Sequence, residues 1–107
     1  MTTPEQGLTA SLNQLIDDNI SNPAFSTDMI CHELGLSRSQ LHRHIKEQTH
    51  LSVTLFIRQH RLEKARDLLL TSSSRISEIA DLVGITNPQN FSKYFTEAFA
   101  VIPTEFR

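Results

Sequence analysis

One eight-residue pattern occurs twice in this 107-residue chain, and it constrains the fold more than any other feature. Residues 30–37 read ICHELGLS and residues 79–86 read IADLVGIT. Each copy has a small residue four positions before a glycine, followed by an apolar residue and a hydroxyl. A small residue lets two helices cross closely, and a glycine adopts the left-handed turn that ends the first helix. The repeated spacing therefore predicts two helix-turn-helix units.

Apolar residues recur at helical spacing over nearly the whole chain, and no stretch alternates as a strand does. Glycine occurs three times and proline four times, so little interrupts this pattern. We expect an all-α, homeodomain-like fold with helices over residues 4–20, 27–35, 37–49, 52–70, 75–83 and 88–99 and a short seventh from Pro103. We expect a single domain over residues 1–107. It would hold a first helix-turn-helix unit (1–50), a long linker helix (51–71) and a second unit (72–107).

Each expected helix carries apolar residues along one side, which we expect to form the core. They are Leu8, Leu12, Leu15 and Ile16; Leu41 and Ile45; Leu55, Leu62, Ala65 and Leu69; and Phe91, Phe95, Phe99 and Phe106. The single cysteine, Cys31, rules out a disulfide framework and fits a reducing compartment. We interpret it as a small core residue.

The second helix of each unit presents a polar outer face opposite its buried residues. At about 100° per residue, four side chains of each helix share this face. They are Ser39, His42, Arg43 and Lys46 in the first unit and Gln89, Ser92, Lys93 and Thr96 in the second. Neither set contains an acid, although Glu47 and Glu97 lie nearby, whereas a solvated face normally carries both signs of charge. Arg and Lys read guanine and Gln reads adenine in the major groove of DNA, so these faces favour DNA binding.

A net charge of −2 would by itself argue against DNA binding, but the charges are unevenly distributed. Residues 1–36 hold five acids and no Lys or Arg, for a charge of −5. Residues 37–66 carry +5, and residues 67–107 carry −2. The local field matters more to a polyanion than the net charge does. We therefore expect DNA binding of modest affinity, with the first unit supplying more of it than the second.

The expected linker helix supports the same interpretation. About nineteen residues at ~1.5 Å each span roughly 28 Å, close to the ~34 Å between successive major grooves on one side of B-DNA. One monomer can therefore place its two polar helices in adjacent major-groove segments. The basic side chains of the linker helix either face the DNA backbone or pair with Glu63 or Asp67 on the helix surface. These basic residues are Arg58, Arg61, Lys64 and Arg66.

Four stretches of the chain resemble the C-terminal DNA-binding domain of AraC/XylS-family transcription regulators. They are LGLSRSQLHRHIKEQT, RLEKARDLLL, ISEIADLVGITNPQNFSKYFTEAF and the final PTEFR, and the resemblance extends over about residues 8–107. It implies two helix-turn-helix units joined by a linker helix, sequence-specific binding to asymmetric double-stranded DNA sites, and activation of transcription.

The resemblance also implies individual contacts to DNA. Base-reading positions fall on Ser39, His42, Arg43, Gln89, Asn90 and Lys93. Contacts to the groove or to phosphates are expected from Ser37, Arg38, Gln40, Lys46, Thr86, Ser92 and Thr96. Free backbone N–H groups at the start of each of the two helices are expected to bind phosphates as well.

This chain departs from the family pattern at four positions. His50 and Ala100 stand where the family usually has glycine, and a positive φ at either residue costs on the order of 1 kcal/mol. Ile102 replaces a hydroxyl cap before the last proline, and Ile85 replaces a phenylalanine. These changes affect local loop geometry and stability more than the fold.

Other classes of function find little support in the sequence. Ser, His and Asp are scattered and no glycine-rich loop is present, so we expect no enzyme and no catalytic residues. His42 and His44 lie on opposite sides of a helix, and the Cys31-His32 pair lacks further ligands at a suitable spacing, so we expect no metal and no cofactor. A helical protein-interaction module without DNA binding is the remaining alternative. Steep weakening of binding with salt would distinguish DNA binding from it.

We expect a cytoplasmic, nucleoid-associated protein whose partner is double-stranded DNA, with RNA polymerase left open as a second partner. No apolar run is long enough for a membrane span. The isolated domain is expected to be a monomer, with any sensor, receiver or dimerisation domain outside this chain. The target sequence cannot be read from side chains alone, because docking angle and DNA deformability shift each contact.

Overall fold

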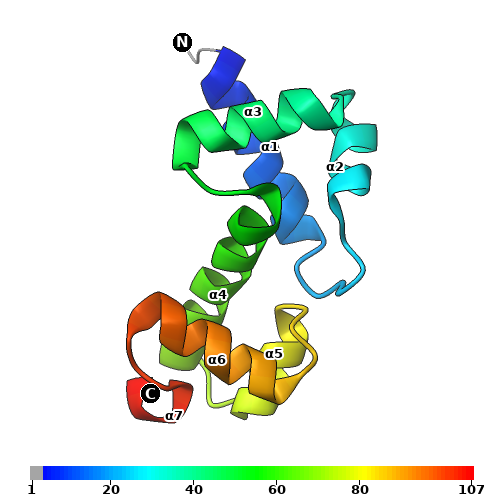
Figure 1. Ribbon diagram of the computed structural model, residues 1–107. Helices are drawn as coiled ribbons and strands as arrows, with labels where there is room; N and C mark the ends of the chain where they lie inside the picture. The colour runs from blue at the N-terminus through cyan, green and yellow to red at the C-terminus, as the bar shows by residue number, and fades with distance from the viewer. Residues whose placement is uncertain (1–3) are drawn as a thin grey trace. The chain divides into compact units, whose positions relative to one another are not determined.

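The computed structural model describes residues 4–107, and over that range the chain forms helices and no strand (Figure 1). The helices are α1 (Pro4–Asp18), α2 (Thr27–Leu34), α3 (Arg38–Thr49), α4 (Val53–Thr71), α5 (Ile76–Leu82), α6 (Pro88–Phe99) and α7 (Pro103–Phe106). The all-α prediction is confirmed, and most helix ends differ from the expected ones by one or two residues. The first helix ends at Asp18, because the Asn19 side chain donates to the Leu15 carbonyl in place of a further turn.

The chain divides into two compact units that each contain one helix-turn-helix. Unit 1 takes the chain as far as Asn19 together with Ala24–Arg58, and unit 2 takes Ile20–Pro23 together with Gln59–Arg107. The helix α4 therefore contributes its first part to unit 1 and the rest to unit 2. The division expected from the sequence, with a separate linker over residues 51–71, stays a prediction.

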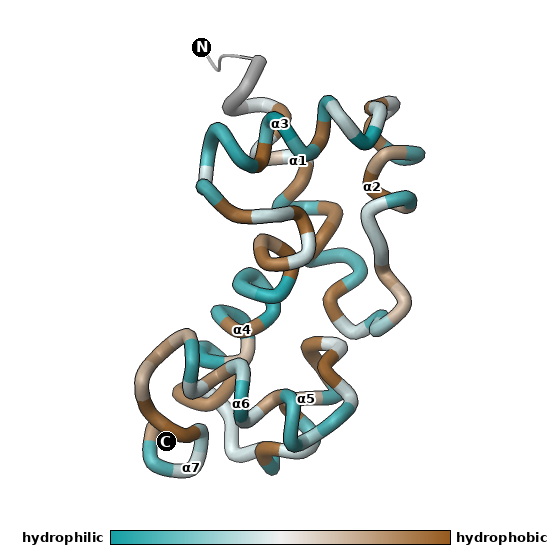
Figure 2. The backbone as a smooth tube through the Cα atoms, viewed as in Figure 1, coloured by the Kyte–Doolittle hydropathy of each residue, from teal (hydrophilic) through white to brown (hydrophobic). Residues whose placement is uncertain are grey.

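In unit 1 the buried residues come from all four of its helical segments and, with Phe25, from the loop before α2. They are Leu12, Ile16, Phe25, Ile30, Leu41, Ile45, Val53 and Ile57. The helices α2 and α3 form the helix-turn-helix, and Gly35 at the turn has a φ of 65°, the left-handed value that the motif predicts. Hydrophobic and hydrophilic stretches follow one another along these helices, as expected for amphipathic elements (Figure 2).

In unit 2 the helices pack around the aromatic residues of α6. Phe91 and Phe95 are fully buried, together with Leu62, Ala65 and Leu69 of α4 and Ile79, Ala80 and Val83 from the α5 region. The Phe95 ring lies edge-on to the rings of Phe99 at 4.7 Å and Phe106 at 5.6 Å between centroids. Phe91 and Phe95 are thus confirmed as core residues, whereas Phe99 and Phe106 are half-buried and pack against them.

One expected core residue, Leu55, is in fact 44% exposed, and Leu8 and Leu15 of α1 are only half-buried. Val53 and Ile57 take the buried side of this part of α4. Ile57 and Leu62 are five residues apart, about 140° around an ideal helix. The two ends of α4 therefore bury different faces, each in the core of its own unit. A single apolar stripe along the whole helix was the wrong assumption.

The departures at the helix ends behave as the sequence analysis expects. His50 and Ala100 end α3 and α6 with φ values of 63° and 61°, so both keep the left-handed conformation without glycine. Ile102 precedes α7 and makes no side-chain cap. Arg107 holds this end of the chain instead, because its guanidinium donates to the carbonyls of Leu69, Ser72 and Ser74.

Arg61 is a buried cation within unit 2, with 6% of its surface exposed. Its Nη1 donates to the carbonyls of Ile20 and Val83, each at 2.6 Å, and its Nη2 donates to the carbonyl of Asn22 at 2.9 Å. Burial lowers the pKa of Arg61 below its ordinary value, because desolvation penalises the charged form. Both alternatives expected for this residue, DNA backbone contact and pairing with Glu63, are therefore wrong for Arg61.

We predict that Arg61→Met lowers the free energy of unfolding by about 3 kcal/mol, because it leaves buried carbonyl groups without a donor. The stability of Arg61→Lys should lie between those of the unaltered chain and Arg61→Met, since one ammonium group cannot reproduce the planar fork of donors of a guanidinium. Urea denaturation followed by circular dichroism measures the change. Lys64→Met is the matched control, because Lys64 is exposed on the same helix. Equal midpoints for the Arg61→Met and Lys64→Met variants would contradict the structural role.

We predict that the same substitution has opposite effects at two alanines of the α6 region. Ala100→Gly should raise stability by about 0.5 to 1 kcal/mol, because glycine removes the steric cost of a positive φ. Ala98→Gly, within α6, should lower stability by up to about 1 kcal/mol, because glycine disfavours a helix. Thermal denaturation of the two variants gives the comparison, and a loss of stability in both would contradict strain at Ala100.

Candidate nucleic-acid interface

The start of α3 is fixed by a capping box. The Ser37 hydroxyl accepts from the Gln40 backbone N–H at 3.1 Å, and the Gln40 side chain accepts from the Ser37 N–H at 2.8 Å. Residues 37–40 read SRSQ, the S-x-x-Q form of a capping box, and this reciprocal pair is the bonding that the form predicts. Within the described chain, the N–H groups of Arg38 and Ser39 have no acceptor. The helix start therefore offers two backbone donors to an outside anion.

The outer face of α3 carries the side chains that the sequence analysis places there. Ser39, His42, Arg43 and Lys46 are all exposed, whereas Leu41 and Ile45 are buried on the opposite side. The Lys46 ammonium donates to the His50 carbonyl at 3.3 Å, in the left-handed turn that ends the helix. The orientation of this face is thus as expected, and the base-reading roles stay predictions.

Arg38 at the start of α3 already has a partner within unit 1. Its Nε donates to the Asp28 carboxylate at 2.9 Å, and its Nη2 contacts the same oxygen. The two side chains are 66% and 68% exposed, so water screens this ion pair and it contributes little to stability. Sequence reasoning missed this pair. The sequence feature that could have indicated it is an acid in the first turn of α2, Asp28, together with a basic residue in the first turn of α3, Arg38.

A second contact that the sequence does not reveal connects α3 to α1. His44 lies on the inner side of α3, and its Nε2 lies 3.2 Å from the Thr9 hydroxyl of α1. His44 is half-buried, in contrast to the exposed His42 two residues earlier. The bond orients α3 on α1 without using a side chain of the outer face of α3.

The start of α6 is capped differently from that of α3. The Asn87 side-chain oxygen accepts from the N–H groups of Gln89 at 2.9 Å and Asn90 at 3.1 Å. Pro88, the first residue of the helix, has no N–H. The first three helical residues therefore have no free donor, and the expectation of phosphate-binding N–H groups at this start is wrong.

The outer face of α6 is polar and carries one cation. Gln89, Asn90, Ser92 and Lys93 are exposed, as is Thr86 in the preceding turn. Thr96 is only half-buried, and its hydroxyl donates to the Ser92 carbonyl at 2.7 Å. Its hydroxyl proton is thus already used, so Thr96 contributes less to this face than the sequence analysis expects.

Other kinds of site find no support among residues that the structure describes. No three His, Cys, Asp or Glu side chains in this part of the chain gather as metal ligands would. No described helix is both long and apolar enough to cross a membrane. Cys31 is half-buried beside the turn of unit 1.

The structure contains two helix-turn-helix units, and each presents the polar outer face of its second helix. This arrangement is typical of helix-turn-helix DNA-binding domains. The model of the helix-turn-helix domain family matches residues 30–107. A transcriptional regulator with an AraC-type DNA-binding domain from Chromobacterium violaceum is 30% identical, with a TM-score of 0.87, over 95% of this chain and 90% of that one. The chain belongs to the AraC family of helix-turn-helix DNA-binding domains, which occur in transcription regulators.

Longer proteins contain similar sequences. Histidine kinase P4 of Formosa agariphila is 35% identical over 88% of this chain, and the transcriptional activator RhaR of Pectobacterium carotovorum is 34% identical over 98%. The chain spans 7% of the length of the kinase and 39% of the length of RhaR. The similarity therefore concerns the DNA-binding domain and not the rest of these proteins.

We predict that two serines of α3 have separable roles. Ser37→Ala should lower the free energy of unfolding by about 1 kcal/mol, because it removes the side-chain cap. Ser39→Ala should change stability little, because the Ser39 hydroxyl faces outward. Thermal denaturation of both variants compares them, and equal losses would show that the capping box is not what stabilises this helix start.

Proposed function

We propose that this domain binds double-stranded DNA at specific sequences and regulates transcription, with α3 and α6 entering the major groove. The observation that carries the proposal is the pair of exposed, acid-free outer faces, one on the second helix of each helix-turn-helix unit. An electronegative groove favours such faces and would repel faces of mixed or acidic charge.

The chemistry of the two faces favours different bases. In α3 the cation of Arg43 suits the two acceptors of guanine, with His42 and Ser39 beside it. In α6 the amides of Gln89 and Asn90 suit the donor and acceptor of adenine, with Lys93 as the cation. We therefore propose base-reading roles for these six residues.

The length of α4 supports binding of both helices to one duplex. Its nineteen residues correspond to roughly 28 Å of helix. This length is close to the ~34 Å that separates successive major grooves on one face of DNA. We propose that one monomer occupies adjacent major-groove segments.

Unit 1 should supply the larger share of the affinity. Its recognition helix carries Arg43 and Lys46 on the outer face, and its start offers two backbone donors. Arg38 would add a further contact only by exchanging its exposed ion pair with Asp28 for a phosphate. The outer face of α6 has Lys93 alone, and its helix start is capped from within. Groove or phosphate contacts in unit 2 would fall to side chains, namely Thr86, Ser92 and Lys93.

Further aspects of the function follow from the relatives. RhaR is named as a transcriptional activator, which supports activation as the role of this domain and RNA polymerase as a second partner. We propose that the isolated domain acts as a monomer, that the DNA it binds lies in the nucleoid of the cytoplasm, and that it has no catalytic role. Any signal would be received by a part of a longer regulator.

We predict that selection from random duplexes with this chain enriches a specific sequence. On that sequence Arg43→Ala should weaken binding roughly tenfold or more, because a bidentate contact to guanine is lost. Lys93→Ala should weaken it less. The slope of log affinity against log salt should be steep and negative for the unaltered chain. Electrophoretic mobility shifts over a salt series measure these quantities.

Arg75→Ala is the matched control, because Arg75 is an exposed cation that precedes α5 and belongs to neither α3 nor α6. Its affinity for the selected sequence should stay within about twofold of the unaltered chain. If selection enriches no sequence, the proposal of a transcription regulator is wrong, and the result favours the alternative of a protein-interaction module. If a sequence is enriched but the Arg43 and Lys93 variants bind like the Arg75 variant, the assignment of the recognition faces is wrong.

A further inference from the structure

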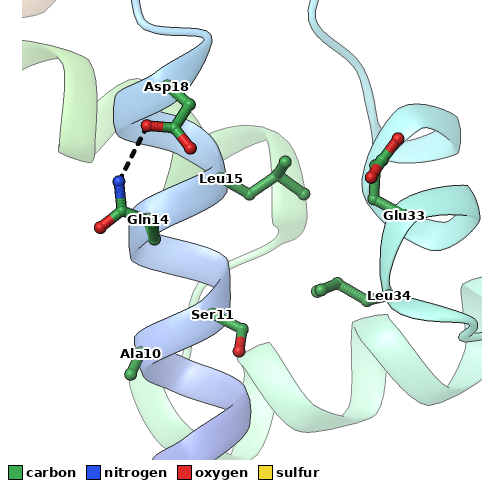
Figure 3. A pocket seen from close by; sticks show the side chains of 7 residues that line it. All are labelled: Ala10, Ser11, Gln14, Leu15, Asp18, Glu33 and Leu34. Atoms are coloured by element: carbon green, nitrogen blue, oxygen red, sulfur yellow. Dashed lines mark hydrogen bonds between the residues drawn. The ribbon is translucent and has the colours of Figure 1, made fainter.

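A groove of about 390 Å³ lies between α1 and α2 in unit 1 (Figure 3). Leu15 of α1 and Leu34 of α2 are both half-buried and point toward one another across it. Ser11 and Gln14 of α1 line the same wall as Leu15. The base of the groove is thus apolar, although it belongs to the surface and not to the core of the unit.

Carboxylates stand on both walls of the groove. Asp18 of α1 and Glu33 of α2 line it and are exposed. Gln14 Nε2 donates to one oxygen of Asp18 at 2.8 Å, and the other oxygen points toward the groove (Figure 3). The bond to Gln14 orients the carboxylate and leaves its charge unpaired.

Both carboxylates lie where helix stability disfavours them. Asp18 is the last residue of α1, and Glu33 is in the last turn of α2. The C-terminal end of a helix carries a partial negative charge, so an acid there is unfavourable by roughly 0.3 to 1 kcal/mol. The last turn of α1 contains no basic residue, and that of α2 contains only His32. Two acids in unfavourable positions around an apolar groove point to a partner and not to folding.

We propose that this groove binds a segment of another protein in which an apolar side chain is flanked by Lys or Arg. The apolar side chain would pack between Leu15 and Leu34, and the flanking cations would pair with Asp18 and Glu33. DNA does not fit this description, because its phosphates would meet two carboxylates. The groove lies on α1 and α2, whereas the polar recognition face belongs to α3, so both surfaces are available at once.

The first experiment titrates the full chain, labelled with ¹⁵N, with a nonapeptide of alternating lysine and leucine. Backbone amide shifts should concentrate on the groove-lining residues of α1 and α2, and they should persist when the chain is saturated with its selected duplex. A peptide with serine in place of leucine should bind at least roughly fivefold more weakly, and so should one with glutamate in place of lysine.

The second experiment compares two double variants with the same change in net charge. Asp18→Asn with Glu33→Gln should weaken peptide binding roughly fivefold, and it should stay folded because both substitutions relieve unfavourable charges. Glu78→Gln with Asp81→Asn removes two exposed acids from α5 in unit 2 and should leave binding within about twofold. The difference between the two variants separates the groove from a general attraction to an acidic protein.

Several outcomes would overturn the proposal. Equal binding of the serine peptide would reduce the interaction to charge alone, and shifts spread over both units would show that no site exists. Self-association of the unaltered chain, abolished by the groove variant in sedimentation experiments, would make a second copy the occupant. Groove amides shifted by duplex in the absence of peptide would assign the surface to DNA. None of these results bears on whether α3 and α6 bind DNA, which the duplex selection tests separately.

Discussion

The left-handed turn is the constraint on which both helix-turn-helix units depend. Gly35 and Gly84 have φ values of 65° and 78° at the two turns, and His50 and Ala100 have 63° and 61° where the recognition helices end. A right-handed helix continues unless one residue leaves its conformation, so these four residues set the direction of every following segment. The turns precede the recognition helices, and therefore fix which side chains of α3 and α6 face outward.

The two glycines meet this constraint in different surroundings. A Cβ on Gly35 would meet no atom within 4 Å, so only its φ requires glycine. A Cβ on Gly84 would lie 1.7 Å from Nη1 of Arg61. The guanidinium of Arg61 thus fills the space that the missing side chain leaves and binds the carbonyl of Val83 just before it. The same motif encodes an open turn in unit 1 and a turn built around a buried cation in unit 2.

Much of this architecture could be predicted because the turn motif and the helical periodicity are local. The buried pairs Leu41–Ile45 and Phe91–Phe95 follow from the spacing within one helix. The error at Leu55 arose because α4 belongs to two cores, and no local pattern shows where a helix changes partner. The burial of Arg61 could not be predicted for a related reason. Its acceptors are backbone carbonyls up to 41 residues away, and every residue has a carbonyl, so the sequence does not indicate which ones Arg61 binds. Capping was predictable at both recognition helices, because the S-x-x-Q pattern indicates the box at Ser37 and an asparagine before Pro88 indicates the cap at Asn87.

The charge distribution of unit 1 connects its two surfaces physically. The outer face of α3 carries Arg43 and Lys46, whereas α1 and α2 carry acids and no Lys or Arg, although Asp28 of α2 pairs with Arg38 at the start of α3. A polyanion attracts the first face and repels the second, and it therefore orients the unit before any base is read. If α3 enters the major groove as proposed, the same repulsion would keep the carboxylates of Asp18 and Glu33 away from the duplex and exposed to other molecules. Acids that weaken the ends of two helices thus serve orientation as well as the proposed recognition of a basic segment, and one charge pattern accounts for both.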